Sequence, residues 1–199
     1  IGAVTDPYQP IEKKYRITRK ILKILLENNI SPFILTKSPD IIDDINILKQ
    51  MNKPVICFTI NHDFISEHFE YGTSAQKNRI KAIKELNLSN ISAYAHVGPY
   101  FPYITDYYDM INKIDGICER INFESLNFKM IFNEEMFYQK ISKFNSNLPE
   151  LYMKMKESEF YYNQYWNELR ERIIQRTGEK RIKTTIMFRP HDQYYKNDN

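Results

Sequence analysis

Two patterns of apolar and polar positions follow one another along the chain. Short runs of apolar residues predict strands, and longer segments with an apolar residue at every third or fourth position predict helices. The predicted strands are residues 1–4, 32–36, 54–60, 91–97, a stretch within 116–124 that ends near residues 123–125, and 183–188. The predicted helices are residues 10–28, 40–49, 74–87, 106–114, a mixed segment at 127–144, and 148–176. Four successive strand–helix units predict an α/β fold with a parallel sheet or barrel, joined by right-handed crossovers.

Local signals refine these elements. Pro10 suits the first turn of its helix, and Asp40 and Ser74 are candidate N-caps of the two helices that follow them. Residues 61–73 are predicted to be a polar loop, and residues 191–199 a polar tail.

The composition limits the classes of protein to consider. A chain of 199 residues is long enough for one sizeable core, so a single domain is the default. The two cysteines, Cys57 and Cys118, are too few for a disulfide framework or a four-ligand metal site. The net charge of +3 neither demands nor excludes nucleic acid, and no apolar run reaches membrane-spanning length. We therefore expect no membrane partner.

Polar side chains follow the predicted strands, and the carboxyl ends of parallel strands are where α/β folds place their chemistry. The loop at residues 5–12 carries hydroxyl, carboxylate, phenol and amide groups on a proline-stiffened frame. It is either a ligand-binding loop or a capped entry to a helix. Lys37 follows the next strand and is either an anion-binding lysine or a solvated one.

The later strand ends leave further alternatives open. His62 and Asp63 would form an acid–base pair only if adjacent loop residues faced each other, which is unusual. Arg79 is either a surface residue or a ligand contact, and His96 either faces the mouth of the barrel or is a satisfied core histidine. The pattern alone therefore predicts an α/β domain with a polar site at the strand ends.

Four motifs carry a more specific resemblance. They are TDPYQPIEK at 5–13, LTKS at 35–38, a Glu–Arg pair nine residues apart at 70 and 79, and GP at 98–99 before a proline at 102. In order and spacing, over roughly residues 1–125, this set resembles the radical S-adenosylmethionine (SAM) superfamily. It is most similar to the group related to spore photoproduct lyase, described as DNA repair photolyase-like.

The resemblance implies a partial TIM-type (β/α)6 barrel that lacks its first β/α unit. It also implies a [4Fe-4S] cluster and SAM at the open end, where a 5'-deoxyadenosyl radical would abstract hydrogen from an unknown substrate. Three clustered cysteines in a CxxxCxxC loop hold such a cluster, and Cys57 and Cys118 do not form that motif. The cluster ligands are therefore expected upstream of Ile1, and the chain is expected to be a fragment, inactive by itself, with no metal ligand of its own. An electron donor such as a flavodoxin or ferredoxin is the implied redox partner. The oxygen-sensitive cluster also implies a reducing, cytoplasmic location, with which the two cysteines are compatible.

The same resemblance assigns cofactor-binding positions, all toward SAM, and no catalytic residue. Thr5, Asp6 and Gln9 stand where the superfamily contacts the methionine amino group, and Tyr8 would help to close the site. Thr59 is a candidate ribose contact.

The remaining positions follow later strands. Lys37 and Ser38 would hold the carboxylate or ribose of SAM, and Arg79 would pair with the methionine carboxylate. Glu70 would bind the ribose or orient Arg79, and His96 would border the adenine.

The C-terminal third differs in character from the rest. We expect residues 1–126 to form the barrel and 127–199 a mainly helical extension packed on it. Basic residues, among them Arg170, Arg172 and Arg176, interleave there with aromatic ones, as in nucleic-acid surfaces. A helix that packs its aromatic side chains on the barrel and exposes its basic face has the same pattern. The alternatives to an enzyme fragment are thus a non-catalytic barrel remnant and a nucleic-acid-binding protein.

Overall fold

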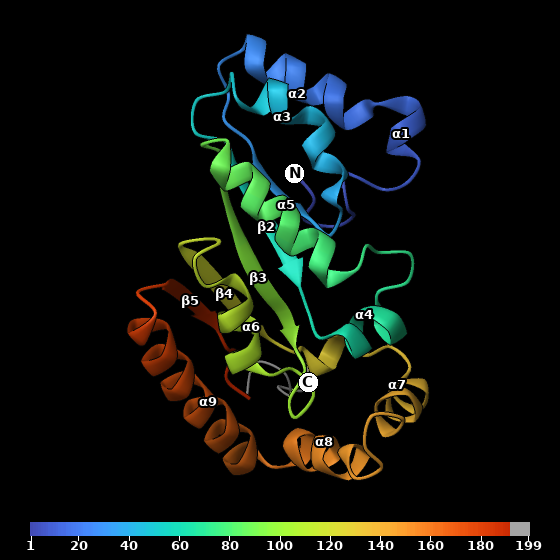
Figure 1. Cartoon of the computed structure of the whole chain (residues 1–199). Helices are drawn as coiled ribbons and strands as arrows, with labels where there is room; N and C mark the ends of the chain where they lie inside the picture. The colour runs from blue at the N-terminus through green and yellow to red at the C-terminus, as the bar shows by residue number, and fades with distance from the viewer. Residues whose placement is uncertain (192–199) are drawn as a thin grey trace, which may run out of the picture.

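A computed structural model of the chain describes residues 1–191 and shows a parallel sheet flanked by helices (Figure 1). The sheet has five strands in the order β1-β2-β3-β4-β5, and all neighbours are parallel. The strands are β1 (Phe33–Thr36), β2 (Val55–Ile60), β3 (Ser92–Tyr100), β4 (Arg120–Ser125) and β5 (Lys183–Met187). Strand order follows chain order without reversal, which is the arrangement of a partial TIM-type barrel. The predicted α/β fold class is confirmed.

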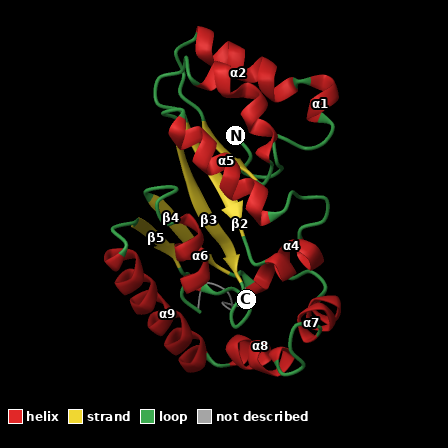
Figure 2. Ribbon diagram, viewed as in Figure 1, coloured by secondary structure: helices red, strands yellow, loops and turns green. Residues whose placement is uncertain are grey.

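Helices connect and cover the strands, and α5 and α6 lie over the sheet in the view of Figure 2. The α-helices are α1 (Glu12–Tyr15), α2 (Ile17–Glu27), α3 (Ile45–Leu48), α4 (Asp63–Phe69), α5 (Gln76–Leu88), α6 (Tyr107–Ile114), α7 (Glu134–Ser142), α8 (Leu148–Glu157) and α9 (Glu159–Glu179). Two short 3-10 helices are η1 (Pro39–Asp44) and η2 (Phe128–Met130). Helix α5 packs on β2 and β3, and α9 packs on α6 and β5.

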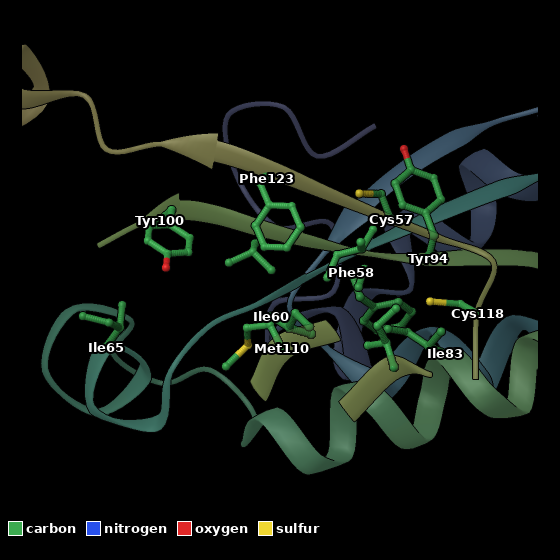
Figure 3. Close-up of a cluster of buried hydrophobic side chains, with 14 of the residues drawn as sticks. Cys57, Phe58, Ile60, Ile65, Ile83, Tyr94, Tyr100, Met110, Cys118 and Phe123 are labelled. Carbon is green, nitrogen blue, oxygen red and sulfur yellow. The ribbon is translucent and has the colours of Figure 1, made fainter. Parts of the chain in front are cut away.

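The core lies between the sheet and its helices. Five of the six residues of β2 are buried, as a strand covered on both faces requires. Phe58 and Phe123 are fully buried, and Figure 3 shows them among aliphatic and aromatic side chains from several strands and helices. This core fixes the strand ends, and therefore the geometry of anything built on them.

Several predicted elements near the start of the chain need correction. Residues 1–4 do not form a strand, although Ile1 makes two ladder-like hydrogen bonds, to the carbonyl of Phe33 and from the amide of Leu35. The predicted helix at 10–28 is two helices, because Arg16 takes the left-handed conformation between α1 and α2.

Three predicted capping or loop assignments were also wrong. The cap before η1 is Ser38, whose hydroxyl accepts a hydrogen bond from the amide of Asp40, so Asp40 is not the cap. The expected loop at 61–73 contains α4, whose amide at Phe64 is capped by the His62 ring. Helix α5 begins after Ala75 without a side-chain cap, so Ser74 does not cap it.

The C-terminal third contributes to the sheet as well as to its cover. The predicted long helix at 148–176 is two helices, because Ser158 takes an extended conformation and caps α9. Strand β5 pairs with β4, so this third supplies a strand in addition to helices. The domain boundary at residue 126 stays a prediction, and of the expected polar tail, residues 192–199 lie outside the described residues.

Candidate functional site

A cavity of about 640 Å³ opens at the carboxyl ends of the strands. Its wall combines the loop at residues 2–6, the ends of β1 to β4 and the segment 125–140. Five of the positions predicted from sequence line it: Thr5, Asp6, Lys37, Thr59 and His96. Parallel strands bring residues that are far apart in the sequence to one edge of the sheet, which is why these side chains meet.

Asp6 ties the N-terminal loop to the end of β1. Its carboxylate accepts hydrogen bonds from the Thr36 hydroxyl at 2.7 Å and from the amides of Lys37 at 2.6 Å and Tyr8 at 2.8 Å. A carboxylate with three donors is held firmly in place. Asp6 therefore fixes the backbone beside Lys37, whatever ligand the cavity takes.

Lys37 belongs to a buried charge network. Its ammonium lies 3.2 Å from Glu70 Oε1, and the other carboxylate oxygen lies 3.0 Å from Arg79 NH1. The Arg79 guanidinium, fully buried, also donates to the Thr59 carbonyl, the Ser74 carbonyl and the Thr73 hydroxyl. Arg79 thus lies behind the cavity wall and holds Glu70, while Lys37, about one-third exposed, reaches the cavity.

His96 and Glu124 form the opposite side of the cavity. His96 Nε2 lies 3.3 Å from Glu124 Oε2, and Arg189 lies 3.7 Å from the other carboxylate oxygen. The hydrogen bond from His96, assisted by the charges of His96 and Arg189, lowers the pKa of Glu124 against the opposing effect of its burial. The structure thus places His96 in the cavity wall, in contact with Glu124, with little of its side chain exposed.

The backbone at Gly98 makes room for this pair. A Cβ at position 98 would lie 2.1 Å from His96 Nε2, so the imidazole would have to move. Glycine therefore allows the imidazole to take this position.

Glu124 was not among the predicted site residues. It occupies the end of β4, so the same strand-end rule that selected Thr59 and His96 would have selected it. The sequence pattern does end this strand near residues 123–125, but Glu124 was not selected as a candidate.

Large apolar side chains surround the mouth of the cavity. Val4, Met130, Phe132 and Met136 line it and are all exposed, Val4 and Phe132 almost completely. Exposed apolar groups gathered around a polar cavity are typical of a binding site.

Five predicted site residues do not line the cavity: Glu70 and Arg79 lie behind its wall, and Tyr8, Gln9 and Ser38 lie elsewhere. The Tyr8 hydroxyl donates to Asp44 at 3.0 Å, an acceptor that also pairs with Arg19, and burial is the main cause that raises the pKa of Tyr8. Gln9 is exposed, and Ser38 serves as the helix cap described above. Any role of these residues toward SAM stays a prediction.

The described residues do not fit a metal cluster. Within residues 1–191, no group of three or more His, Cys, Asp or Glu side chains is placed to hold a metal ion. Cys57 and Cys118 are buried in the core, and burial raises the pKa of Cys57 to about 12. A [4Fe-4S] cluster needs clustered thiolates, so this part of the chain does not supply its ligands.

The basic and aromatic side chains of α9 are largely used within the fold. Trp166 is buried, Arg170 lies over the Phe188 ring, and Arg176 pairs with Glu179. These contacts are those of a helix that packs its aromatic face inward. No helix of the described part is long and apolar enough to span a membrane.

Comparisons with known proteins point to one fold. No protein-family model matches the chain. The uncharacterized protein MJ0683 of Methanocaldococcus jannaschii is 30% identical over 131 residues, which are 65% of this chain and 50% of that protein. The chain thus spans about half the length of this curated relative.

Solved structures of spore photoproduct lyase share the fold. The enzyme complexed with dinucleoside spore photoproduct matches with a TM-score of 0.65 and 14% identity over 94% of this chain and 60% of that one. A mutant with bound AdoMet and dinucleoside spore photoproduct matches with a TM-score of 0.62 and 14% identity over 93% of this chain and 58% of that one. The fold is therefore that of spore photoproduct lyase, of which this chain spans about three-fifths.

Proposed function

We propose that this chain is the SAM-binding barrel of a radical SAM enzyme related to spore photoproduct lyase. One observation carries the proposal: Lys37 reaches the strand-end cavity as an ammonium group that Glu70 and Arg79 hold in place from behind. Similarity in fold to a lyase structure with bound AdoMet supports SAM as the ligand.

Residues of the cavity would give SAM a charged contact and polar contacts. The Lys37 ammonium would pair with the methionine carboxylate, and Thr59 and Thr5 would offer polar contacts near it. Bound SAM would supply the adenosyl group from which such enzymes form a radical. The chain's own residues would bind SAM, orient it and shield it from water.

The [4Fe-4S] cluster that the proposed chemistry requires is not provided for by the described residues. Because those residues do not fit a [4Fe-4S] cluster, its ligands would come from elsewhere in the protein. The same proposal includes an electron donor for the enzyme, a substrate from which hydrogen is abstracted, and a cytoplasmic location. The bounds of the barrel at residues 1–126 are part of it too.

Isothermal titration calorimetry of SAM binding to native protein and to Lys37→Met tests the proposal. Loss of a charge-assisted contact should weaken binding about tenfold or more. Lys81→Met, which removes an exposed lysine of α5, is the matched control and should bind as the native protein does. Equal affinity of Lys37→Met and native protein, or no binding by the native protein, would sink the proposal.

A further inference from the structure

A second cavity, of about 930 Å³, opens at the other end of the sheet, where the strands begin. The first residues of β2, β3, β4 and β5 line it: Val55, Ser92, Arg120 and Lys183. Strand β4 has six residues, so its two ends lie about 16 Å apart at the usual rise of a strand. This cavity is therefore separate from the strand-end cavity that SAM occupies in the proposed function.

Basic side chains predominate in the wall of this second cavity. Four cations and two carboxylates line it: Arg120, Lys180, Arg181, Lys183, Asp115 and Glu119. Lys180 is already paired with Asp115, which leaves three cations and one carboxylate. The charge of the wall therefore favours an anion.

Two of these cations stand side by side. Arg120 and Lys183 are Cα partners in the parallel ladder between β4 and β5. Paired strands lie about 4.8 Å apart and partner residues point to the same face, so both side chains leave the sheet together. Within residues 1–191, no ion pair joins either of them to a carboxylate. Like charges opposite each other on paired strands are destabilising, and an anion between them would remove that repulsion.

An aromatic ring holds Arg120 in place. The guanidinium carbon lies 5.4 Å from the centroid of the Tyr94 ring, and Tyr94 is only 7% exposed, so the ring is a fixed support. A cation–π contact fixes the guanidinium without pairing it with an acceptor. Arg120 and Lys183 are both exposed, so their charged groups can reach a ligand in the cavity.

We propose that Arg120 and Lys183 form a phosphate-binding site at the amino ends of β4 and β5. The guanidinium fork pairs with two phosphate oxygens, and the lysine ammonium adds a point charge beside it. A carboxylate has only two oxygens, which the fork alone would occupy, whereas a phosphate group has oxygens for both cations. The phosphate belongs either to a small phosphate monoester or to the phosphodiester backbone of nucleic acid. The site does not depend on SAM or on the proposed function.

Isothermal titration calorimetry with inorganic phosphate, at an ionic strength held constant with sodium chloride, tests the site. The native protein should bind phosphate saturably. Arg120→Gln and Lys183→Gln should each weaken binding about tenfold, because each removes a charge-assisted contact. Lys77→Gln removes the same charge from an exposed position of α5 that does not line this cavity, and it should bind like native protein.

Thermal unfolding gives a second measurement. Phosphate should raise the unfolding temperature of native protein and of Lys77→Gln, and raise that of Arg120→Gln much less. Without phosphate, Lys183→Gln should be at least as stable as native protein, because the repulsion from Arg120 is gone. A lower unfolding temperature for Lys183→Gln would contradict the repulsion on which the site rests.

Two further probes distinguish the sources of the phosphate. Tighter binding of glycerol 2-phosphate than of a thymidylate decamer without terminal phosphate would assign the site to monoesters, and the reverse order would assign it to nucleic acid. In either case Arg120→Gln should lose the binding. Absence of saturable phosphate binding by native protein, or equal binding by native protein, Arg120→Gln and Lys183→Gln, overturns the site.

Discussion

The guanidinium of Arg79 lies 3.0 Å from the carboxylate of Glu70, and both side chains are almost completely removed from solvent. Removing one partner of a buried ion pair leaves the other charge uncompensated. Because Glu70 also faces Lys37, the pair determines both the stability of the fold and the position of the cavity lysine.

Arg79→Ala should therefore lower the free energy of unfolding by about 3–5 kcal/mol. Urea denaturation followed by circular dichroism measures it. Arg172→Ala is the matched control, because Arg172 is largely exposed and its change should stay within about 0.5 kcal/mol. A loss for Arg79→Ala as small as that of the control would show that the pair does not hold the wall.

Acid should weaken the fold in part through Glu124. Its pKa is lowered in the folded state, so its contribution is present above the unfolded-state pKa of about 4.3 and is lost as the pH falls through the folded-state value. Urea midpoints of native protein and Glu124→Gln at pH 6 and pH 3.5 should show a smaller acid-induced decrease in the variant. An equal decrease in both would contradict the role of His96 and Arg189.

Gly98→Ala should displace the His96 imidazole, because the added Cβ would meet it at 2.1 Å. The His96 hydrogen bond is the largest cause that lowers the pKa of Glu124, so that pKa should rise toward its ordinary value. Carboxyl-detected NMR titration measures the change. Gly178→Ala, where a Cβ would meet nothing within 4 Å, should leave the Glu124 pKa unchanged. A native-like titration of Glu124 in Gly98→Ala would refute the expectation.

The two cysteines should be inert in the folded protein. Burial raises the pKa of Cys57 to about 12 and also raises that of Cys118, so neither forms the reactive thiolate at pH 8. Figure 3 shows both thiols among core side chains. Ellman's reagent should label them only after guanidinium unfolding, and both should then react. Rapid labelling of either cysteine in the native state would contradict its placement.

Much of the sheet could be predicted because the sequence pattern is local. Continuous apolar runs such as 54–60 are typical of buried parallel strands, and five strands of the structure overlap predicted ones. The errors were a strand predicted at 1–4 that does not form, helix α4 missed within 61–73, and several helix caps and breaks. Arg16 interrupts an apparently continuous helix through a left-handed backbone conformation that its residue type did not reveal. Ser158 is a favoured N-cap residue type, and this signal for the second break was overlooked.

The candidate site was predictable only by the rule that polar residues follow parallel strands. That rule selected Lys37, Thr59 and His96, which the cavity brings together. Glu124 fits the same rule, since the predicted strand ends near it, but it was not selected. It gave no means to separate Lys37, which reaches the cavity, from Arg79, which lies behind it.

The sequence by itself determined the order of strands and helices and the polar residues at the strand ends, because periodicity and turn chemistry act over a few neighbouring residues. Only the tertiary structure decided which of those side chains share one cavity. The buried ion pair Glu70–Arg79 and the His96–Glu124 contact join residues on different elements, and their geometry depends on how the sheet and helices pack.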